Sequence, residues 1–283
     1  MALPVSDQLL ERLMEEDVPY GDLTTKILGI GHKPGKIVFS TREPTVLCAT
    51  EEAAGILQKF GAEIRLAKPS GEYLPEGVVF LEAQGTAAAL HAGWRLALNL
   101  LEYVSGIATR TRRIVDIAKK INPDISIAPT RKSFPGTKKL AIKAVECAGA
   151  RPHRLGLSES ILIFKHHMAF LGGLESLCAD IKRLRVEAPS MKLAIEVEDE
   201  AGAVSAANAG FDIIQVDKMT SAGLIELIGK VRAINPAILI AAAGGVNEAN
   251  TAEYAATGAD ILVLSSVFFG KTSDIGARIV PLP

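Results

Sequence analysis

The second half of the chain alternates short apolar runs with helical stretches, and this alternation limits the possible folds more than any other feature. Six runs have the apolar, β-branched character of buried strands, at residues 125–128, 161–164, 192–197, 212–216, 238–242 and 260–264. Between them the sequence predicts helices over residues 137–147, 174–187, 200–209, 221–233 and 248–257. Strands this apolar, separated by helices, are typical of parallel β/α units. We expect either an α/β barrel of fewer than eight strands or a doubly wound open sheet, and we favour the barrel.

The first third of the chain predicts an α+β unit whose strands pair antiparallel. A first helix begins after Ser6, where apolar residues recur at helical spacing, and residues 17–25 form a turn-rich connector. Strands are expected at residues 35–40, 46–48 and 78–83, and a helix over residues 51–60 that stops at Gly61.

Residues 90–120 are helical in composition almost throughout, with an interruption at Ser105-Gly106 that predicts a kink or a division into two helices. We place the boundary between two domains at this interruption. The first domain then comprises residues 1–108, and the second comprises residues 109–283 and carries the active site.

Bulk composition excludes several classes of protein. The formal net charge of −1 gives no basic excess for nucleic acid, so any anion site must be local. The three cysteines are far apart in the sequence, which favours a reducing compartment over a disulfide framework or a zinc cluster. No apolar run approaches the ~18 to 20 residues of a membrane span. The first residues also lack the apolar core of a signal peptide. We therefore expect a cytoplasmic protein.

The segment from residue 130 to 154 concentrates cationic side chains around a predicted strand. Arg131 and Lys132 follow the first strand of the second domain, and His153 and Arg154 follow a loop that contains Gly and Pro. Arginine offers a planar fork for carboxylate or phosphate, and lysine offers a point charge. These four side chains predict a concave anion site, whereas the lysines of the helix between them are typical of a solvated face.

Other reactive groups follow the remaining strands, and the carboxyl ends of parallel strands meet at one edge. Gly244-Gly245 lets backbone amides approach a phosphate, aided by the helix predicted to follow. Glu198 and Asp217 are suited to holding Mg²⁺, binding sugar hydroxyls or stabilising a developing positive charge. The remaining polar groups at these ends are Lys165, His166, His167, Glu196, Lys218, Ser265 and Ser266.

Several ordered motifs resemble one known family. TRKSFPG, HRLGLSE, IEVE, VDK, AAAGGV and TGADIL, together with DVPYGDLTT and LNLLEYVSGIATRTR nearer the amino terminus, are similar to the nicotinate-nucleotide pyrophosphorylase (quinolinate phosphoribosyltransferase) family. Within this family, the chain resembles the ModD branch, which comprises pyrophosphorylases associated with molybdenum transport. Three segments carry this resemblance: PGTKKLAIKAV, PHRLGLSESILIF and AAAGGVNEAN.

The resemblance implies an amino-terminal α/β sandwich domain, an incomplete α/β barrel, and a homodimer or a hexamer of dimers whose active sites are shared between subunits. It also implies phosphoribosyl pyrophosphate and Mg²⁺ as ligands. By residue, it implies that Arg95 is lent by the neighbouring subunit and that Lys132 lies beside an acid-substrate pocket. The implied pocket residues are Arg131, His153 and Arg154, the implied carboxylates near ribose and metal are Glu198 and Asp217, and the implied phosphate turn contains Gly244. We add Lys165, Gly245 and Ser265 to the expected substrate-binding set.

The chain departs from the family pattern at positions that bear on the substrate. Phe164 stands where the quinolinate enzymes have a lysine, although Lys165 follows it, and Lys218 replaces an asparagine. Small or hydroxyl side chains replace a glutamate, a serine and a glycine near the phosphate turn, at Ala241, Ala243 and Ser265. A lost charge-assisted contact is worth ~1.5 to 3 kcal/mol, enough to change substrate preference.

Our working hypothesis is pentosyl transfer from phosphoribosyl pyrophosphate to an anionic acceptor, with Lys132, Glu198 and Asp217 as catalytic residues. A second hypothesis is quinolinate phosphoribosyltransferase itself, with Lys165 moving into the position of the missing lysine. A third is a non-catalytic protein that binds molybdate or a cofactor precursor in the cationic mouth. A Schiff-base aldolase built on Lys132 is a distant fourth, because Lys132 has no clear acid-base partner.

Overall fold

The structure is a computed structural model that describes residues 5–283, and it divides into two compact units. The first unit comprises the chain up to Arg112 together with Phe134–Gly149 and Phe268–Pro283, and the second comprises Arg113–Ser133 and Ala150–Val267. The expected division between residues 108 and 109 falls inside one long helix. Two segments of the expected second domain, around α5 and at the carboxyl terminus, lie in the first unit.

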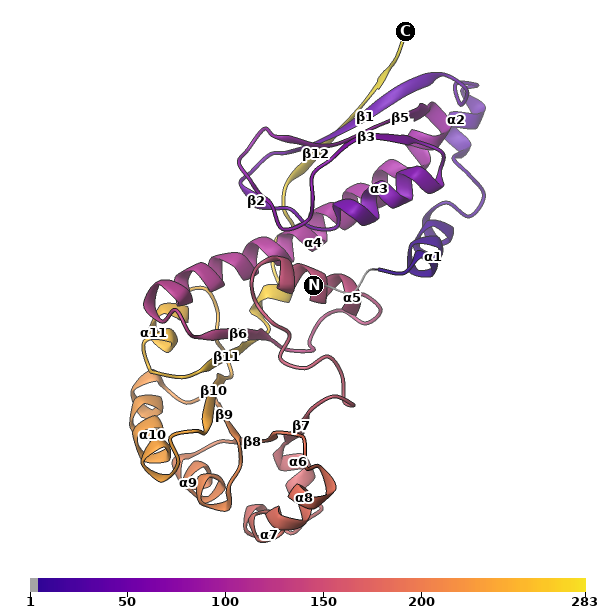
Figure 1. The fold of residues 1–283 in the computed structure, drawn as a ribbon. Helices are drawn as coiled ribbons and strands as arrows, with labels where there is room; N and C mark the ends of the chain where they lie inside the picture. Colours follow the sequence, from indigo (N-terminus) through magenta and orange to yellow (C-terminus); the bar gives the residue numbers. More distant parts are fainter. Residues whose placement is uncertain (1–4) are drawn as a thin grey trace. The chain divides into compact units, whose positions relative to one another are not determined.

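The first unit is built on a four-stranded antiparallel sheet with the order β12-β1-β5-β3 (Figure 1). Alternate side chains of β1 point into the core, where Ile37 and Phe39 are fully buried. The strands are β1 (Pro34–Thr41), β3 (Glu63–Ala67), β5 (Val79–Thr86) and β12 (Ile275–Pro281), with α3 (Thr50–Lys59) in contact with β3 and β5. The antiparallel pairing that the sequence predicts is confirmed, although β3 and β12 were not predicted.

Shorter elements complete the first unit. They are α1 (Asp7–Asp17), α2 (Leu23–Ile27), β2 (Thr45–Val46) and β4 (Tyr73–Leu74), the last two paired with each other. The expectation of a connector throughout residues 17–25 is wrong at its end, because the Asp22 carboxylate accepts hydrogen bonds from the backbone N–H groups of Thr24 and Thr25 and caps α2.

A single helix, α4 (Ala87–Ile121), runs through the position where the sequence predicts a kink or a break. The prediction that the helix is interrupted at Ser105-Gly106 is therefore wrong. Ser105 Oγ instead accepts a hydrogen bond from Cys48 N at 2.9 Å and donates one to Cys48 O at 3.1 Å. A Cβ at Gly106 would lie 3.0 Å from both Thr272 Cα and Ser273 N. Ser105 and Gly106 thus allow two other segments, around Cys48 and around Thr272, to lie close to the helix.

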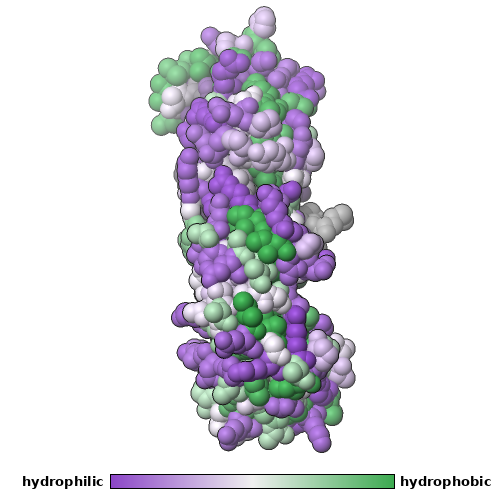
Figure 2. Space-filling model, turned by 90° about the vertical axis from the view of Figure 1, so that its left-hand side faces the viewer, coloured by the Kyte–Doolittle hydropathy of each residue, from purple (hydrophilic) through white to green (hydrophobic). Residues whose placement is uncertain are grey.

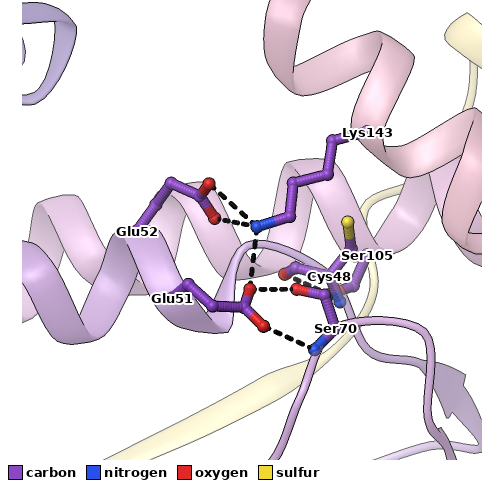
Figure 3. A network of polar contacts seen from close by, with 6 residues as sticks. All are labelled: Cys48, Glu51, Glu52, Ser70, Ser105 and Lys143. Atoms are coloured by element: carbon purple, nitrogen blue, oxygen red, sulfur yellow. Dashed lines mark hydrogen bonds and ion pairs between the residues drawn. The ribbon is translucent and has the colours of Figure 1, made fainter. Parts of the chain in front are cut away.

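Helix α5 (Lys138–Cys147) belongs to the first unit, although the sequence predicts it as a helix of the barrel. Its Leu140 and Ala144 pack in a cluster with residues of β2 and α4. Lys143 Nζ lies 2.8 Å from Glu51 Oε2 and 2.6 Å from Glu52 Oε2, as Figure 3 shows. Because Lys143 and Glu52 are almost fully buried, this ion pair ties α5 to the start of α3.

The second unit is built on a parallel sheet of six strands with the order β6-β11-β10-β9-β8-β7. Its strands are β6 (Ser126–Pro129), β7 (Ile161–Ile163), β8 (Leu193–Val197), β9 (Ile213–Asp217), β10 (Leu239–Ala243) and β11 (Ile261–Leu264), so all six predicted strands are present. The sheet is strongly curved, with α9, α10 and α11 on its outer side (Figure 1). Within the described residues, β6 and β7 each pair with one neighbour, and the incomplete barrel is confirmed.

The helices of the second unit differ from the prediction mainly in length. The expected helix 174–187 is divided at Asp180, and the expected helix 248–257 is reduced to five residues. The helices are α6 (Lys165–Met168), α7 (Leu174–Ala179), α8 (Ile181–Glu187), α9 (Glu200–Ala209), α10 (Ser221–Ile234) and α11 (Thr251–Ala255), with the short 3-10 helix η1 (Ser266–Phe268) after β11.

The face in Figure 2 carries mostly hydrophilic side chains with smaller hydrophobic patches among them. In the first unit, large apolar side chains are exposed on and around α2, at Tyr20, Leu23, Ile27 and Leu28. Across residues 5–283, none of the helices combines the length and the hydropathy that a membrane crossing requires.

Candidate active site

A cavity of about 580 Å³ opens at the carboxyl ends of the strands of the second unit, where parallel β/α folds bind their ligands. Its walls come from the ends of β6, β7, β8, β9, β10 and β11 and from the loops that follow them. Four cationic side chains and two carboxylates line it: Arg131, Lys132, Arg154 and Lys218, with Glu196 and Asp217. The cavity is therefore electropositive although the chain as a whole is not.

All four residues predicted to form an anion site line this cavity, namely Arg131, Lys132, His153 and Arg154. Arg131 and Lys132 are exposed directly after β6, whereas His153 and Arg154 are half-buried before β7. Arg154 is held in place by Ser160, because Nε donates to Ser160 Oγ and Nη2 donates to Ser160 O, both at 2.9 Å. A guanidinium fixed on one side in this way is oriented for an anion on the other.

The buried Gln215 and the half-buried Glu196 form a polar pair in the cavity wall, at directly opposed positions of β9 and β8. Gln215 Nε2 donates to Glu196 Oε2 at 2.6 Å, and Gln215 Oε1 is buried without a hydrogen-bond partner among the described residues. Burial raises the pKa of Glu196, and the neighbouring carboxylates of Asp217 and Glu198 add to this shift. The pair gives an otherwise apolar wall a fixed polar group.

Burial also lowers the pKa of the His153 imidazole, and the adjacent Arg154 guanidinium lowers it further. An interaction with the Gln215 side chain opposes this shift but does not meet normal hydrogen-bond geometry. The neutral imidazole is thus the favoured form of His153 at neutral pH, and the positive charge of the cavity comes from the arginines and lysines.

Asp217, Lys218 and Gly244 form the turn where β9 and β10 end side by side. Lys218 has a left-handed φ of 59°, its N–H donates to Ala243 O, and its Nζ lies 3.8 Å from Asp217 Oδ2. Gly244 has a φ of 86°, and any side chain there would meet Asp217 and Lys218. Glycine is therefore required at this position both by its backbone conformation and by the close approach.

Gly245 continues the turn with a φ of 87° and is held by two asparagines. Asn247 Nδ2 and Asn250 Nδ2 both donate to Gly245 O, at 2.9 and 3.1 Å. Helix α11 begins only at Thr251 and has five residues, so the expected support of this turn by the positive end of a following helix is wrong. Ser265 lines the cavity beside the turn, and Ser266 Oγ donates to Val246 O.

Three predicted site residues, Lys165, Glu198 and Arg95, lie outside the cavity lining. Lys165 Nζ and Glu198 Oε1 form an ion pair at 2.6 Å, with both side chains about 60% exposed, at 62% and 63%. Each group holds the other in its charged form, since the pair lowers the pKa of Glu198 and raises that of Lys165. Arg95 belongs to the first unit, where its guanidinium lies over the Trp94 ring at 4.0 Å.

The resemblance implies Mg²⁺, an ion that side chains of the cavity would have to bind through oxygen atoms. The described residues contain no cluster of three or more His, Cys, Asp or Glu side chains that would hold a metal ion by themselves. Mg²⁺ in phosphate-handling sites is bound by one or two carboxylates and otherwise by substrate oxygens and water. Asp217 fits that requirement, because its carboxylate lines the cavity and Gly244 leaves it uncovered. Glu198 fits less well, because Lys165 occupies its carboxylate.

Sequence reasoning did not select Glu196, Gln215 or Lys218 as site residues, although all three line the cavity. Glu196 and Lys218 lie at strand ends that the sequence analysis did identify. The inward direction of Glu196 depends on strand register, which the pairing of Glu196 with Gln215 now fixes. Gln215 carried a signal that was available, since it is a polar residue in an otherwise apolar strand.

The fold and cavity together define a half-barrel α/β protein with an electropositive site at the carboxyl ends of its strands. The chain matches the family model for the C-terminal domain of quinolinate phosphoribosyl transferase over residues 107–275 and the model for its N-terminal domain over residues 22–105. It therefore belongs to the quinolinate phosphoribosyltransferase family, whose members are pentosyltransferases.

Similar proteins fall into two named groups. The chain is 42% identical over 250 residues to a Rhodobacter capsulatus protein named "Putative pyrophosphorylase ModD", covering 88% of this chain and 95% of the relative. It is 31% identical over 247 residues to the "Probable nicotinate-nucleotide pyrophosphorylase [carboxylating]" of Archaeoglobus fulgidus, covering 87% and 92%. The crystal structure of NadC from Streptococcus pyogenes shares the fold, with a TM-score of 0.88, 24% identity and complete coverage of both chains.

Proposed function

We propose that this protein transfers the phosphoribosyl group of phosphoribosyl pyrophosphate to a nitrogen of an anionic acceptor and releases pyrophosphate. The observation that carries the proposal is the convergence of Arg131, Lys132 and Arg154 with Asp217 in one cavity. Cations of this number suit two anionic substrates, and the Asp217 carboxylate among them suits a reaction in which positive charge develops. Membership of the family supports the reaction class.

Each residue has a chemical role in this proposal. The acceptor nitrogen attacks C1 of the ribose with its lone pair while the bond from C1 to the pyrophosphate oxygen breaks. Positive charge grows on the ribose ring as that bond lengthens, and the Asp217 carboxylate stabilises it. No general base is required when the acceptor nitrogen carries a free lone pair.

The anionic groups would be divided between two sides of the cavity. Arg131 and the oriented Arg154 guanidinium would bind the acid group of the acceptor, with Lys132 beside them. The Gly244-Gly245 turn and Ser265 would receive the phosphates of the donor substrate. Asp217 would hold Mg²⁺, and the ion would neutralise negative charge on the leaving group. Lys165 and Glu198, expected as substrate-binding and catalytic residues, would act at the rim as a pair.

We propose further that the preferred acceptor differs from quinolinate. Gln215 places a buried amide on the wall, and Ala241 and Ala243 leave β10 with small side chains near the cavity. Phe164 lines the cavity where a lysine was expected from the resemblance. A site with a buried amide discriminates strongly between ligands that can hydrogen-bond to it and ligands that cannot.

A direct assay tests this function. The purified protein is incubated with phosphoribosyl pyrophosphate, Mg²⁺ and a panel of carboxylated nitrogen heterocycles that includes quinolinate, and pyrophosphate release is measured. We expect release with at least one acceptor and its loss in Asp217→Asn. Nicotinate mononucleotide formed from quinolinate as fast as any other product would instead support the quinolinate enzyme. Tight binding of molybdate with no binding of phosphoribosyl pyrophosphate would support a non-catalytic oxyanion-binding protein and a link to molybdenum transport.

We also propose that the protein is a homodimer, or a hexamer of dimers, in which Arg95 serves the cavity of the neighbouring subunit. Two observations support an interface: Arg95 is an exposed arginine, and apolar side chains around α2 are exposed. Light scattering tests the assembly. Mixing the inactive variants Arg95→Ala and Lys132→Ala tests sharing, because mixed dimers would regain activity in one of their two sites. A monomer, or no regain on mixing, would contradict the proposal.

A further inference from the structure

Cys48 and Cys147 are far apart in the sequence but adjacent in the first unit. Cys48 is fully buried in a cluster with residues of β2, α4 and α5, and Cys147 packs against the same cluster. The two thiol groups lie close enough to shift each other's pKa. Gly71 marks the same contact from a third segment, because its N–H donates to Leu47 O while a Cβ on it would lie 3.9 Å from Cys147 Cβ.

The ion pair of Lys143 fixes the position of these thiols. Lys143 lies one helical turn before Cys147 on α5, so both side chains are on the same face of that helix. Its partners Glu51 and Glu52 lie in the first turn of α3, which begins two residues after Cys48. Figure 3 shows Cys48 next to this network. Because the buried charge pair holds α5 to this segment, it also holds Cys147 against the cluster that contains Cys48.

The surroundings make the two thiols unequal. The neighbouring Cys48 thiol lowers the pKa of Cys147, and the Lys143 ammonium contributes in the same direction, against the opposing effects of burial and of the Glu51 and Glu52 carboxylates. The neighbouring Cys147 thiol and burial both raise the pKa of Cys48. Cys147 is also partly exposed, whereas Cys48 is not. A thiolate that a small oxidant can reach, beside a second thiol, is the arrangement of redox-reactive cysteine pairs.

We propose that Cys48 and Cys147 form a reversible disulfide when the protein meets a hydroperoxide. The Cys147 thiolate attacks the terminal peroxide oxygen, the O–O bond breaks, and the alkoxide or hydroxide leaves with a proton from water. Cys147 is thereby oxidised to a sulfenic acid. The Cys48 sulfur then attacks Cys147 Sγ, an S–S bond forms, and the sulfenic oxygen leaves as water with the Cys48 proton. A dithiol reductant restores both thiols.

The pair does not depend on the proposed transferase activity, because it lies among α3, α4 and α5 of the first unit. The linkage would join residues about a hundred positions apart, and a long closed loop restricts the unfolded chain most. It would also fix the carboxyl-terminal end of α5, the helix that follows the Arg131 segment in the chain. The structure thus assigns a modification site to residues that no substrate contact requires.

The test is oxidation of the folded full-length protein with hydrogen peroxide, followed by thiol titration and peptide mass mapping. We expect the three titratable thiols to fall to one, with a Cys48–Cys147 peptide that has lost two hydrogen atoms and that a dithiol reductant separates. Cys178, which has one Sγ contact to Ser205 O and a pKa raised by burial, remains free. The control Cys178→Ser should behave as the unmodified chain.

Variants separate the two roles. Cys48→Ala should leave a Cys147 sulfenic acid that dimedone traps, and Cys147→Ser should protect Cys48 from oxidation altogether. Circular dichroism and the urea midpoint of each variant verify that the comparison is made on folded protein. The proposal is overturned if the unmodified chain keeps three thiols under peroxide, if the linkage includes Cys178, or if Cys48 is oxidised as readily in Cys147→Ser as in the unmodified chain.

Discussion

Gly244 lies against the carboxylate of Asp217 so closely that a Cβ on Gly244 would fall within 3.0 Å of Asp217 Oδ1 and of Lys218 N. This relationship joins the ends of β9 and β10 at the cavity. It also distinguishes Gly244 from Gly245, because a Cβ on Gly245 would meet no atom within 4 Å.

Gly244→Ala should therefore be far more damaging than Gly245→Ala. Both substitutions place a side chain on a left-handed backbone, which costs about 1–2 kcal/mol. Gly244→Ala adds the collision with Asp217 and Lys218, so we expect a larger loss of unfolding free energy and loss of phosphoribosyl pyrophosphate binding. Urea denaturation and calorimetric titration measure the two effects. Equal losses in the two variants would show that the close approach is unimportant.

Arg131→Ala should weaken binding of the anionic acceptor without affecting stability. Arg131 is exposed, so the fold loses little, whereas a charge-assisted hydrogen bond contributes about 1.5–3 kcal/mol to binding. The expected Kd rises about 10- to 100-fold in calorimetric titration. Arg183→Ala is the control, because Arg183 is an exposed arginine on α8 that pairs with Asp180 away from the cavity lining. An unchanged Kd in Arg131→Ala would remove this residue from the site.

Lys143→Met should destabilise the protein by about 3–5 kcal/mol, because it leaves the almost fully buried Glu52 without its partner. Lys230→Met is a matched control. Lys230 Nζ lies at the same distance from Glu200 Oε1, 2.6 Å, as Lys143 Nζ does from Glu52 Oε2, but both Lys230 and Glu200 are about half-exposed. Its loss should cost much less, because an ion pair between exposed side chains contributes little to stability. Similar urea midpoints for the two variants would contradict this difference in burial.

Glu51 should contribute a pH-dependent part of the stability. Burial opposes its ionisation, but hydrogen bonds from Lys143 and Ser70 outweigh burial and lower the pKa from an ordinary 4.5 to about 2. Since the folded-state pKa is the lower one, this contribution is complete above pH 4.5 and is lost as the pH falls towards 2. Solvent screening of the half-exposed carboxylate limits it to about 1 kcal/mol. The unfolding free energy measured across this range should fall less steeply in Glu51→Gln than in the unmodified chain.

The control for this measurement is Glu16→Gln, which alters an exposed carboxylate on α1. Its pH profile should follow that of the unmodified chain. Identical slopes for Glu51→Gln and the unmodified chain between pH 4.5 and 2 would mean that the contacts of Glu51 do not persist in solution.

The six parallel strands were predictable because their physical cause is local. β8, β9 and β10 are short apolar runs that are largely buried on both faces, and a helix follows each of them along the chain. Strands β3 and β12 were missed for the opposite reason. β3 is largely exposed, and β12 gains its place by pairing with β1, more than two hundred residues earlier in the chain.

Long-range contacts also decided the errors in the helices. Ser105-Gly106 has the local character of a break, yet Gly106 admits the backbone of Thr272 and Ser273 and Ser105 bonds to Cys48. These partners lie far away in the sequence, so composition alone could not separate a break from a close approach. Helix α5 was predicted correctly in extent, but its place in the first unit depends on Lys143 and its carboxylate partners.

The candidate site was predictable where strand ends determine position. Arg131, Lys132, Arg154 and Asp217 line the cavity as the order of the strands requires. The sequence could not decide between Glu196 and Glu198, because the choice depends on the hydrogen-bond partner of each carboxylate. Lys165 donates to Glu198 outside the cavity lining, and Gln215 donates to Glu196 in the cavity wall.

The alanines of β10 have a consequence for how the acceptor could change over time. Ala128, Ala241 and Ala243 share a buried cluster with Val263 in the interior of the half-barrel, and Ala243 also lines the cavity. Each methyl group added at Ala243 would narrow the room for an acceptor without displacing Asp217 or the glycine turn. A single substitution on β10 would therefore change the size of the acceptor that the cavity admits. The residues proposed to bind phosphate would stay the same.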